Sequence, residues 1–182
     1  LDSNITHPAS LLLHCDGAND GVVFTDSSFF NFVPTVNGNT HTDTAIKKFG
    51  TASAQFDGTG DFLSYTAADQ WDFGSGDFTI DCWVNRNNDT GRVGVIGNWT
   101  SMSAPFGGGW SLEINASNFI DFYWDYGANY HQLLGSTAIT GTGWHHIAIV
   151  RNGSNWQAYL NGTSEDSETY SDTIDTTTND LV

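Results

Sequence analysis

Apolar and polar residues alternate with a period of two along segments 77–84 (Asp-Phe-Thr-Ile-Asp-Cys-Trp-Val) and 118–124 (Asn-Phe-Ile-Asp-Phe-Tyr-Trp). This alternation is typical of β-strands, because successive side chains of a strand point to opposite faces of its sheet. No stretch keeps apolar residues at the i, i+3, i+4, i+7 spacing of an amphipathic helix. Shorter runs of the strand type predict further strands at 10–15, 21–24, 52–56, 62–65, 93–98, 110–114, 145–151 and 156–160.

Turn-forming residues separate nearly all of these segments, with glycine-containing turns at 57–60, 74–76 and 107–109. Asn152-Gly153 lies in a short polar stretch between two predicted strands, which predicts a β-hairpin. Many short strands without helices between them are typical of an antiparallel sandwich or barrel. Segment 163–180 is rich in Ser, Thr, Asp and Glu, and we expect it to be an exposed loop.

The composition of the chain argues against two classes of binding partner, nucleic acids and membranes. The chain has 182 residues, the length of one domain, and carries 5 Lys and Arg against 21 Asp and Glu, a formal net charge of -16. Binding to a phosphate backbone needs clustered cations, so we expect no nucleic-acid partner. The same charge disfavours docking onto an anionic membrane, and no apolar run approaches the ~20 residues of a membrane span, so we expect no membrane insertion.

An ordered set of short motifs supports a more specific interpretation. The motifs are Leu11–Gly17, Lys47–Ser53, Phe56–Leu63, Phe73–Val84, Gly109–Leu112, Trp144–Arg151 and Tyr159–Gly162. With them the chain resembles a laminin G-like domain of the concanavalin A-like lectin/glucanase superfamily, in particular its bacterial and phage branch. The resemblance implies an all-β, two-sheet antiparallel jelly-roll sandwich over residues 10–182, preceded by a lead-in at 1–9.

Members of this family usually close with a last strand of the pattern Gly-x-apolar-Asp-acidic-apolar-Arg. Nothing after Gly162 resembles that pattern, so residues 163–182 are expected to form an exposed loop and the start of a further strand. The chain begins at Leu1, and its single methionine is Met102. We therefore expect a piece of a longer protein, with the missing C-terminal strand or strands following Val182.

The resemblance also bears on catalysis. Glucanases of this superfamily carry two glutamates around an aspartate on one strand, and a retaining mechanism needs two carboxyl groups ~5–5.5 Å apart. Glutamate occurs here only at 113, 165 and 168, and Glu113 has no second carboxylate at i+2 or i+4. We therefore expect no enzyme activity.

Relatives of this fold often hold one structural calcium ion near the rim of a sheet, and carboxylate oxygens suit that ion. The candidate ligands are Asp16, Asp57 and Asp61, because each follows a predicted strand in a glycine-containing turn that matches the family pattern. The alternative is that Asp-Gly sequences simply form good turns. A zinc or iron site is not expected, because the six histidines are scattered and His145 and His146 point to opposite faces of one strand.

Sugar recognition places a flat aromatic face against the C–H side of a pyranose and polar groups against its hydroxyls. Trp83, Trp110 and Trp144 match strand positions of the family and are expected in the core. Segment 123–131 gathers aromatic and polar residues, and Trp99 opens a loop rich in Gly, Ser and Pro. The alternative is an aromatic sheet edge without any ligand. The candidate glycan-binding residues are Trp99, Trp124, Tyr126, Asn129 and Tyr130.

Cys15 and Cys82 both continue an apolar alternation, so they are either buried free thiols or partners in a disulfide. The sequence leaves both alternatives open.

Together these observations favour a non-catalytic carbohydrate-binding or adhesion module that is extracellular or on a virion surface. Its partner would be a cell-surface glycan or a neighbouring virion or surface protein, with homo-oligomers formed through the parent protein. The acidic composition suits a saline medium that screens self-repulsion, such as a marine setting. The alternative is a structural or decoration module of a phage virion or surface assembly, without a sugar ligand.

Overall fold

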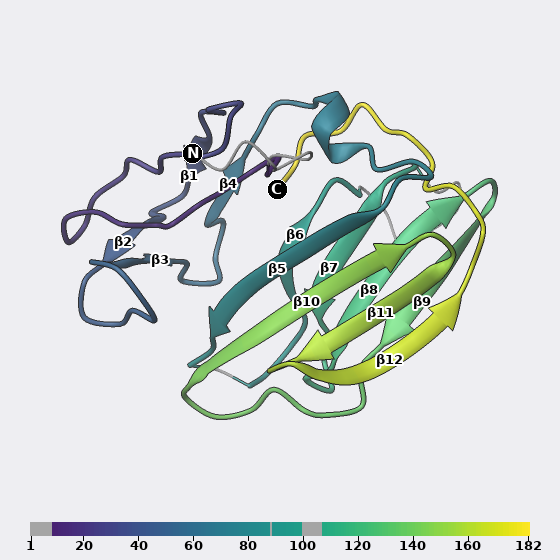
Figure 1. Ribbon diagram of the computed structural model, residues 1–182. Coiled ribbons are helices and arrows are strands. Elements are labelled where there is room, and N and C mark those ends of the chain that lie inside the picture. Colours follow the sequence, from purple (N-terminus) through teal and green to yellow (C-terminus); the bar gives the residue numbers. More distant parts are fainter. Residues whose placement is uncertain (1–8, 88, 100–106) are drawn as a thin grey trace, which may run out of the picture. The chain divides into compact units, whose positions relative to one another are not determined.

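The computed structural model describes residues 9–87, 89–99 and 107–182 (Figure 1). The chain divides into two compact units, unit 1 (1–66 with Val182) and unit 2 (67–181). Unit 1 contains the short strands β1 (Thr35–Asn37), β2 (His41–Asp43), β3 (Ser53–Gln55) and β4 (Phe62–Ser64). Strand β1 pairs with β4 and β2 pairs with β3, both antiparallel.

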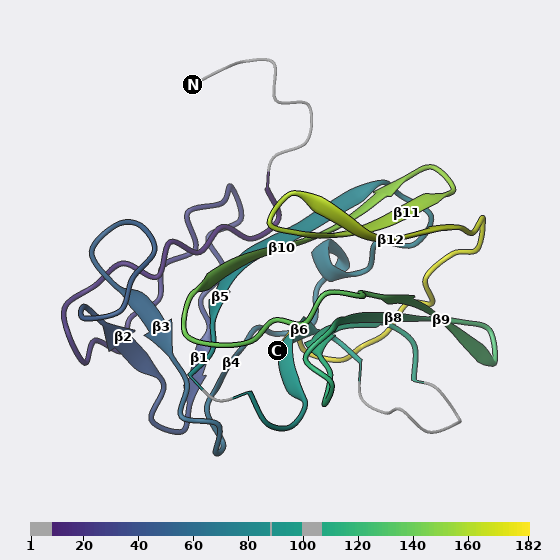
Figure 2. The same cartoon turned by 90° about the horizontal axis from the view of Figure 1, so that it is seen from below.

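Unit 2 contains two four-stranded antiparallel sheets, which Figure 2 shows face to face. In spatial order, the first sheet consists of β12 (Thr163–Thr169), β11 (Asn155–Leu160), β10 (Trp144–Asn152) and β5 (Phe78–Asn85). The second consists of β6 (Val93–Gly97), β7 (Trp110–Ile114), β8 (Ile120–Tyr126) and β9 (Asn129–Leu134). A 3₁₀ turn, Asp69–Trp71, precedes β5. The all-β, two-sheet sandwich predicted from the sequence is confirmed.

The predicted hairpin is also confirmed, with Asn152 opposite Asn155 and Gly153 at a φ of +61° in the turn. The predicted strands at 10–15 and 21–24 contribute only single bridges, between Leu13 and Asp26 and between Gly21 and Thr42. That the sandwich extends back to residue 10 stays a prediction, because both four-stranded sheets lie within unit 2.

The predicted exposed loop over 163–182 is wrong in its first part, because residues 163–169 form β12 at the edge of the first sheet. Its acidic side chains bind the end of β9 and the residues that follow it. The Asp166 carboxylate accepts the Leu134 N–H at 2.8 Å, and the Glu165 carboxylate accepts the N–H groups of Ser136 and Thr137 at 2.9 and 2.7 Å. A polar edge strand resists pairing with foreign strands, so its composition suits its position.

Aromatic stacking dominates the core between the two sheets. Trp124 of β8 and Trp156 of β11 stack with their ring centroids 4.0 Å apart and their planes within 4°. Arg151 lies over Trp156 at 4.6 Å and donates hydrogen bonds to the carbonyl oxygens of Gly74 and Asp172 at 2.7 and 3.0 Å. The buried guanidinium therefore ties the segment after β12 to the sandwich. The described part of the chain holds no helix long and apolar enough to cross a membrane.

Both cysteines are free and half-buried. Cys15 lies in unit 1 and Cys82 lies on β5. Burial raises the pKa of Cys82 to about 12 and raises that of Cys15 as well, so both groups are thiols rather than thiolates at neutral pH.

Candidate functional site: the outer face of β6–β9

Three aromatic side chains meet on the face of the second sheet that points away from the core. Tyr123 of β8 is at the centre, and the rings of Trp99 and Tyr130 lie 5.5 and 5.6 Å from its ring. Tyr123 is buried, Trp99 is half-buried, and Tyr130 is 47% exposed. We call Trp99, Tyr123 and Tyr130 the aromatic cluster. It offers partly exposed aromatic surface on both sides of a fixed central ring.

Strand register explains why these side chains meet. Ile120, Phe122 and Trp124 of β8 face the core, so Tyr123 between them must face outward. On β9, Gln132 is opposite Tyr123, and Tyr130, opposite Asp125, lies two residues from Gln132 on the same face. Tyr130 is therefore the diagonal neighbour of Tyr123. Side chains diagonal across an antiparallel pair remain within reach when they are aromatic.

A polar network surrounds Tyr123 on the same face. The Tyr123 hydroxyl and the Gln132 amide each donate a hydrogen bond of 2.7 Å to the carboxylate of Asp121. Burial, together with the hydrogen bond to Asp121, raises the pKa of Tyr123 to about 12. The hydroxyl therefore stays protonated at neutral pH and remains a donor to this carboxylate.

Arg92 joins a second carboxylate to this network. Its guanidinium forms an ion pair with Glu113, and the same nitrogen lies 3.6 Å from the Asp121 carboxylate. The hydrogen bond with Glu113 raises the pKa of Arg92 further above its ordinary value. Glu113 also accepts a 3.1 Å hydrogen bond from Ser111.

Glu113 and Asp121 are opposite each other in the β7–β8 register, so two carboxylates share one face. A search for acidic residues at i+2 and i+4 misses this pair, because its members lie on different strands. The only sequence signal is two acidic positions of like parity on either side of the turn between β7 and β8. Arg92 contacts both carboxylates, and the side chains of Asp121 and Glu113 are only 2% and 13% exposed. Arg92 and the neutral donors Ser111, Tyr123 and Gln132 therefore engage both carboxylates, which are not an accessible acid–base pair.

The structure brings together two of the predicted glycan-binding residues, Trp99 and Tyr130. The prediction is wrong for Trp124, which is 0% exposed because even-numbered positions of β8 face the core. Tyr126 has the same parity and stacks on His131 at 3.9 Å, outside the aromatic cluster. Asn129 begins β9 opposite Tyr126 and is exposed, also outside the cluster.

The expected core position is confirmed for Trp110, which is buried, and is wrong for Trp83, which is 39% exposed. Trp83 is opposite His146 on the outer face of the first sheet, with the two rings 5.1 Å apart. Trp144, two residues earlier on the same face of β10, is half-buried. His146 also contacts the exposed carboxylate of Asp81 at 3.1 Å.

The predicted calcium ligands do not converge. Among the described residues, no three His, Cys, Asp or Glu side chains lie close enough together to hold a metal ion. The Asp61 carboxylate accepts the N–H groups of Asn39 and Asp57 at 2.7 and 2.8 Å. Thr51 donates hydrogen bonds to Asp16, and they lower the pKa of that carboxyl. These oxygens organise turns, and the three aspartates do not fit one shared calcium ion.

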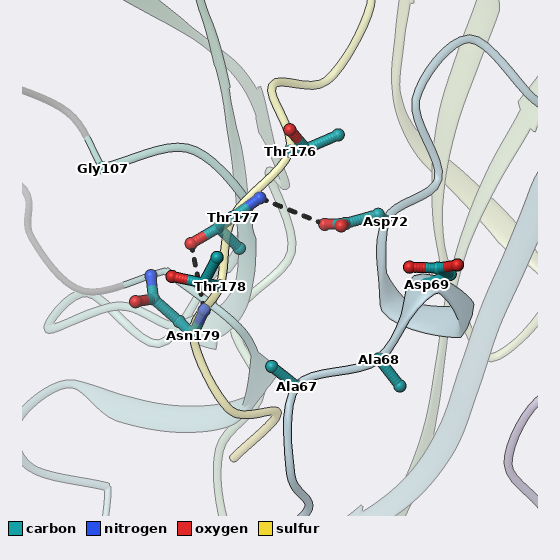
Figure 3. Close-up of a pocket in the computed structure, with 9 residues that line it drawn as sticks. All are labelled: Ala67, Ala68, Asp69, Asp72, Gly107, Thr176, Thr177, Thr178 and Asn179. Atoms are coloured by element: carbon teal, nitrogen blue, oxygen red, sulfur yellow. Dashed lines mark hydrogen bonds between the residues drawn. The ribbon is translucent and has the colours of Figure 1, made fainter.

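A separate hollow of about 560 Å³ lies beside the C-terminal segment of unit 2 (Figure 3). Among the described residues, its lining contains the carboxylates of Asp69 and Asp72 and no aromatic side chain. The Asp72 carboxylate accepts the Thr177 N–H at 3.2 Å, so it already secures the C-terminal segment. The aromatic cluster is therefore the better candidate for a sugar.

Comparison with known families identifies the class of protein that this fold defines. Residues 57–182 match the laminin G-like family described as the concanavalin A-like lectin/glucanases superfamily. The chain belongs to this family. A comparison with curated proteins finds no match.

Proposed function

We propose that this domain is a non-catalytic carbohydrate-binding module that serves adhesion on a virion or cell surface. The observation that carries the proposal is the aromatic cluster, in which Trp99 and Tyr130 flank the fixed ring of Tyr123. Aromatic side chains combine a large apolar face with directed polar groups, which is the combination a sugar ring needs. Membership of a lectin-containing superfamily supports the same function.

The contact surface follows from the exposed parts of the cluster. Tyr130 presents half of its surface, and Arg92 is 37% exposed above its two carboxylates. A glycan would stack on Trp99 and Tyr130 and take hydrogen bonds from the outward donors of Arg92 and from the Tyr130 hydroxyl. The network beneath holds these groups in place before binding, which reduces the entropic cost of association.

The same network supports a non-catalytic role. Glycosidases need one carboxyl group to protonate the leaving oxygen and a second to act on the sugar or on water. Arg92 contacts both Glu113 and Asp121, and Asp121 is too buried to reach a sugar ring. We therefore expect binding without hydrolysis.

A specific observation favours a second candidate, a structural or decoration module. Unit 1 exposes large apolar side chains, among them Phe29 at 79%, Val23 at 74% and Val33 at 86%. Val23 and Val33 line one hollow of this unit, and apolar side chains gathered in this way are typical of protein–protein contacts. Resemblance to the bacterial and phage branch supports a virion or cell-surface location for either function.

A glycan-array screen tests the proposal, with the domain in calcium and then in EDTA. Trp99→Ala and Tyr130→Ala should each lower the affinity for the best array glycan at least about tenfold. Trp83→Ala on the other sheet is the matched control and should leave the affinity unchanged. EDTA should have no effect, because the predicted calcium ligands organise turns. No binding by a demonstrably folded sample contradicts the proposal and favours the structural module.

A further inference from the structure

Asp125, the third outward-facing residue of β8, carries a carboxyl group that is completely buried beneath Trp99. One of its oxygens accepts the indole N–H of Trp99 at 2.9 Å and the backbone N–H of Gly108 at 3.0 Å. The other oxygen is buried and has no hydrogen-bond partner among the residues that the structure describes.

This arrangement costs stability, because a buried carboxylate oxygen that loses water and gains no donor is unfavourable. Burial raises the pKa of Asp125, the hydrogen bonds from Trp99 and Gly108 partly oppose the shift, and the nearby Asp175 adds to it. Buried groups left incompletely paired are rare and concentrate at functional positions. Asp125 is not required for packing of the hydrophobic core, because its side chain is on the face of β8 that points away from the core.

We propose that Asp125 is the positioning residue of the aromatic cluster: its carboxylate holds the indole of Trp99 against Tyr123 and so sets the glycan-binding surface without touching the glycan. The part concerning glycan affinity rests on the proposed function, whereas the part concerning Trp99 stands on the hydrogen bond itself. Trp99 lies 26 positions before Asp125 in the sequence, and this bond joins it to the central strand of the sheet.

The proposal has a pH dependence with a definite sign. Asp175 from the C-terminal segment acts on Asp125 through its charge, and Tyr130 is opposite Asp125 on β9. Neither is a cation, so only the hydrogen bonds from Trp99 and Gly108 favour the ionised carboxylate. The ionised form is the stronger acceptor. Trp99 should therefore become less firmly held as the pH falls through the raised pKa of Asp125.

Stability should change in the opposite direction. Because folding raises the pKa of Asp125, the stabilising effect of its protonated form is complete below the ordinary aspartate pKa. That effect is lost as the pH rises through the folded pKa. Acidification through this window should strengthen the fold locally while it loosens Trp99. A merely structural carboxylate would not separate these two effects.

The test compares Asp125→Ala with Asp125→Asn by following the indole N–H resonance of Trp99, assigned with Trp99→Phe. Asp125→Ala should move this resonance toward the position of a solvent-exposed indole. It should also lower the affinity for the best array glycan at least about tenfold, the effect of losing a charged acceptor. Asp125→Asn keeps an acceptor oxygen, so it should retain the resonance and the affinity and abolish their pH dependence. Asp81→Ala removes a carboxylate from β5 of the other sheet, so as the matched control it should leave both the Trp99 resonance and the affinity unchanged.

The outcomes separate this inference from the proposed function. An unchanged Trp99 resonance in Asp125→Ala overturns the inference whether or not any glycan binds. A displaced resonance, together with a wild-type domain that binds no array glycan, upholds the role of Asp125 and refutes the glycan function. If Asp125→Ala does not fold, the decision passes to Asp125→Asn. A Trp99 pH profile identical to that of the wild type then overturns the inference.

Discussion

The two faces of strand β8 are both buried, yet they differ in chemistry. Ile120, Phe122 and Trp124 pack an apolar core in which each is 0% exposed. On the other face, Asp121 and Asp125 are buried through hydrogen bonds and an ion pair. Apolar burial stabilises the sandwich directly, whereas buried polar groups at best offset their desolvation. The apolar inner face of β8 therefore specifies the fold, whereas the buried carboxylates of its outer face are better explained by a function.

The outer face of the first sheet sharpens the comparison. Trp83 is exposed there, and its ring neighbour His146 pairs with the carboxylate of Asp81, whose side chain is 63% exposed. An exposed tryptophan alone is therefore no mark of a site. What distinguishes the β6–β9 face is that its aromatic cluster rests on buried, hydrogen-bonded carboxylates.

The largest expected effect comes from the inner face. Phe122→Ala should lower the free energy of unfolding by about 3–5 kcal/mol, because it leaves a cavity between Trp110, Trp124 and Phe78. Urea denaturation monitored by far-ultraviolet circular dichroism measures it. A loss below about 1 kcal/mol would mean that the two sheets do not pack as described.

Asp121→Ala should have the next largest effect, a loss of about 2–3 kcal/mol. The substitution removes the acceptor for Tyr123 and Gln132 and one of the two anions beside Arg92. Denaturation of this variant beside Asp121→Asn, which keeps one acceptor oxygen, checks the cause. Equal losses in the two variants would contradict a hydrogen-bonding role.

A smaller effect is expected at the sandwich edge. Partial burial acts to raise the pKa of Glu165, but hydrogen bonds from Ser136 and Thr137 outweigh it, so the pKa is lowered. Its stabilising contribution is therefore complete above the ordinary glutamate pKa and is lost as the pH falls through the folded value. Glu165→Gln should cost less than about 1 kcal/mol at neutral pH. It should also flatten the acid limb of the stability curve, and an unchanged acid limb would sink this account.

The smallest effect is expected for Trp83→Ala, the counterpart of Trp99→Ala on the other sheet. It removes an exposed side chain, so stability should change by no more than about 0.5 kcal/mol, and affinity for the best array glycan should stay within about twofold. Isothermal titration of both variants against that glycan provides the comparison. Equal losses in affinity would remove the distinction between the two faces.

The sequence predicted the sandwich well because alternation with period two survives in its central strands, such as β8 and β10. Strand β12 was missed because its residues are polar on both faces, so no apolar alternation marks it. The exposed position of Trp83 was missed because its core position was expected from the family's strand pattern, although its parity is opposite to that of Phe78, Ile80 and Cys82.

The candidate site was only partly predictable. Trp124 was misplaced because aromatic residues were grouped by closeness in the sequence, although its parity matches that of Ile120 and Phe122. The pairing of Glu113 with Asp121 depends on the β7–β8 register, which no local pattern contains. The bond from Trp99 to Asp125 likewise joins a residue just after β6 to β8, and no local pattern of the sequence contains that contact.

The seven tryptophans offer the most direct measurement of the central claim, that the β6–β9 face binds the glycan. Their indole N–H resonances can be followed together while the best array glycan is titrated into the isotope-labelled domain. The account predicts that the Trp99 resonance shifts in proportion to occupancy, while those of Trp83 and Trp144 on the other sheet stay in place. Shifts at Trp83 and Trp144 with Trp99 unmoved would contradict the account.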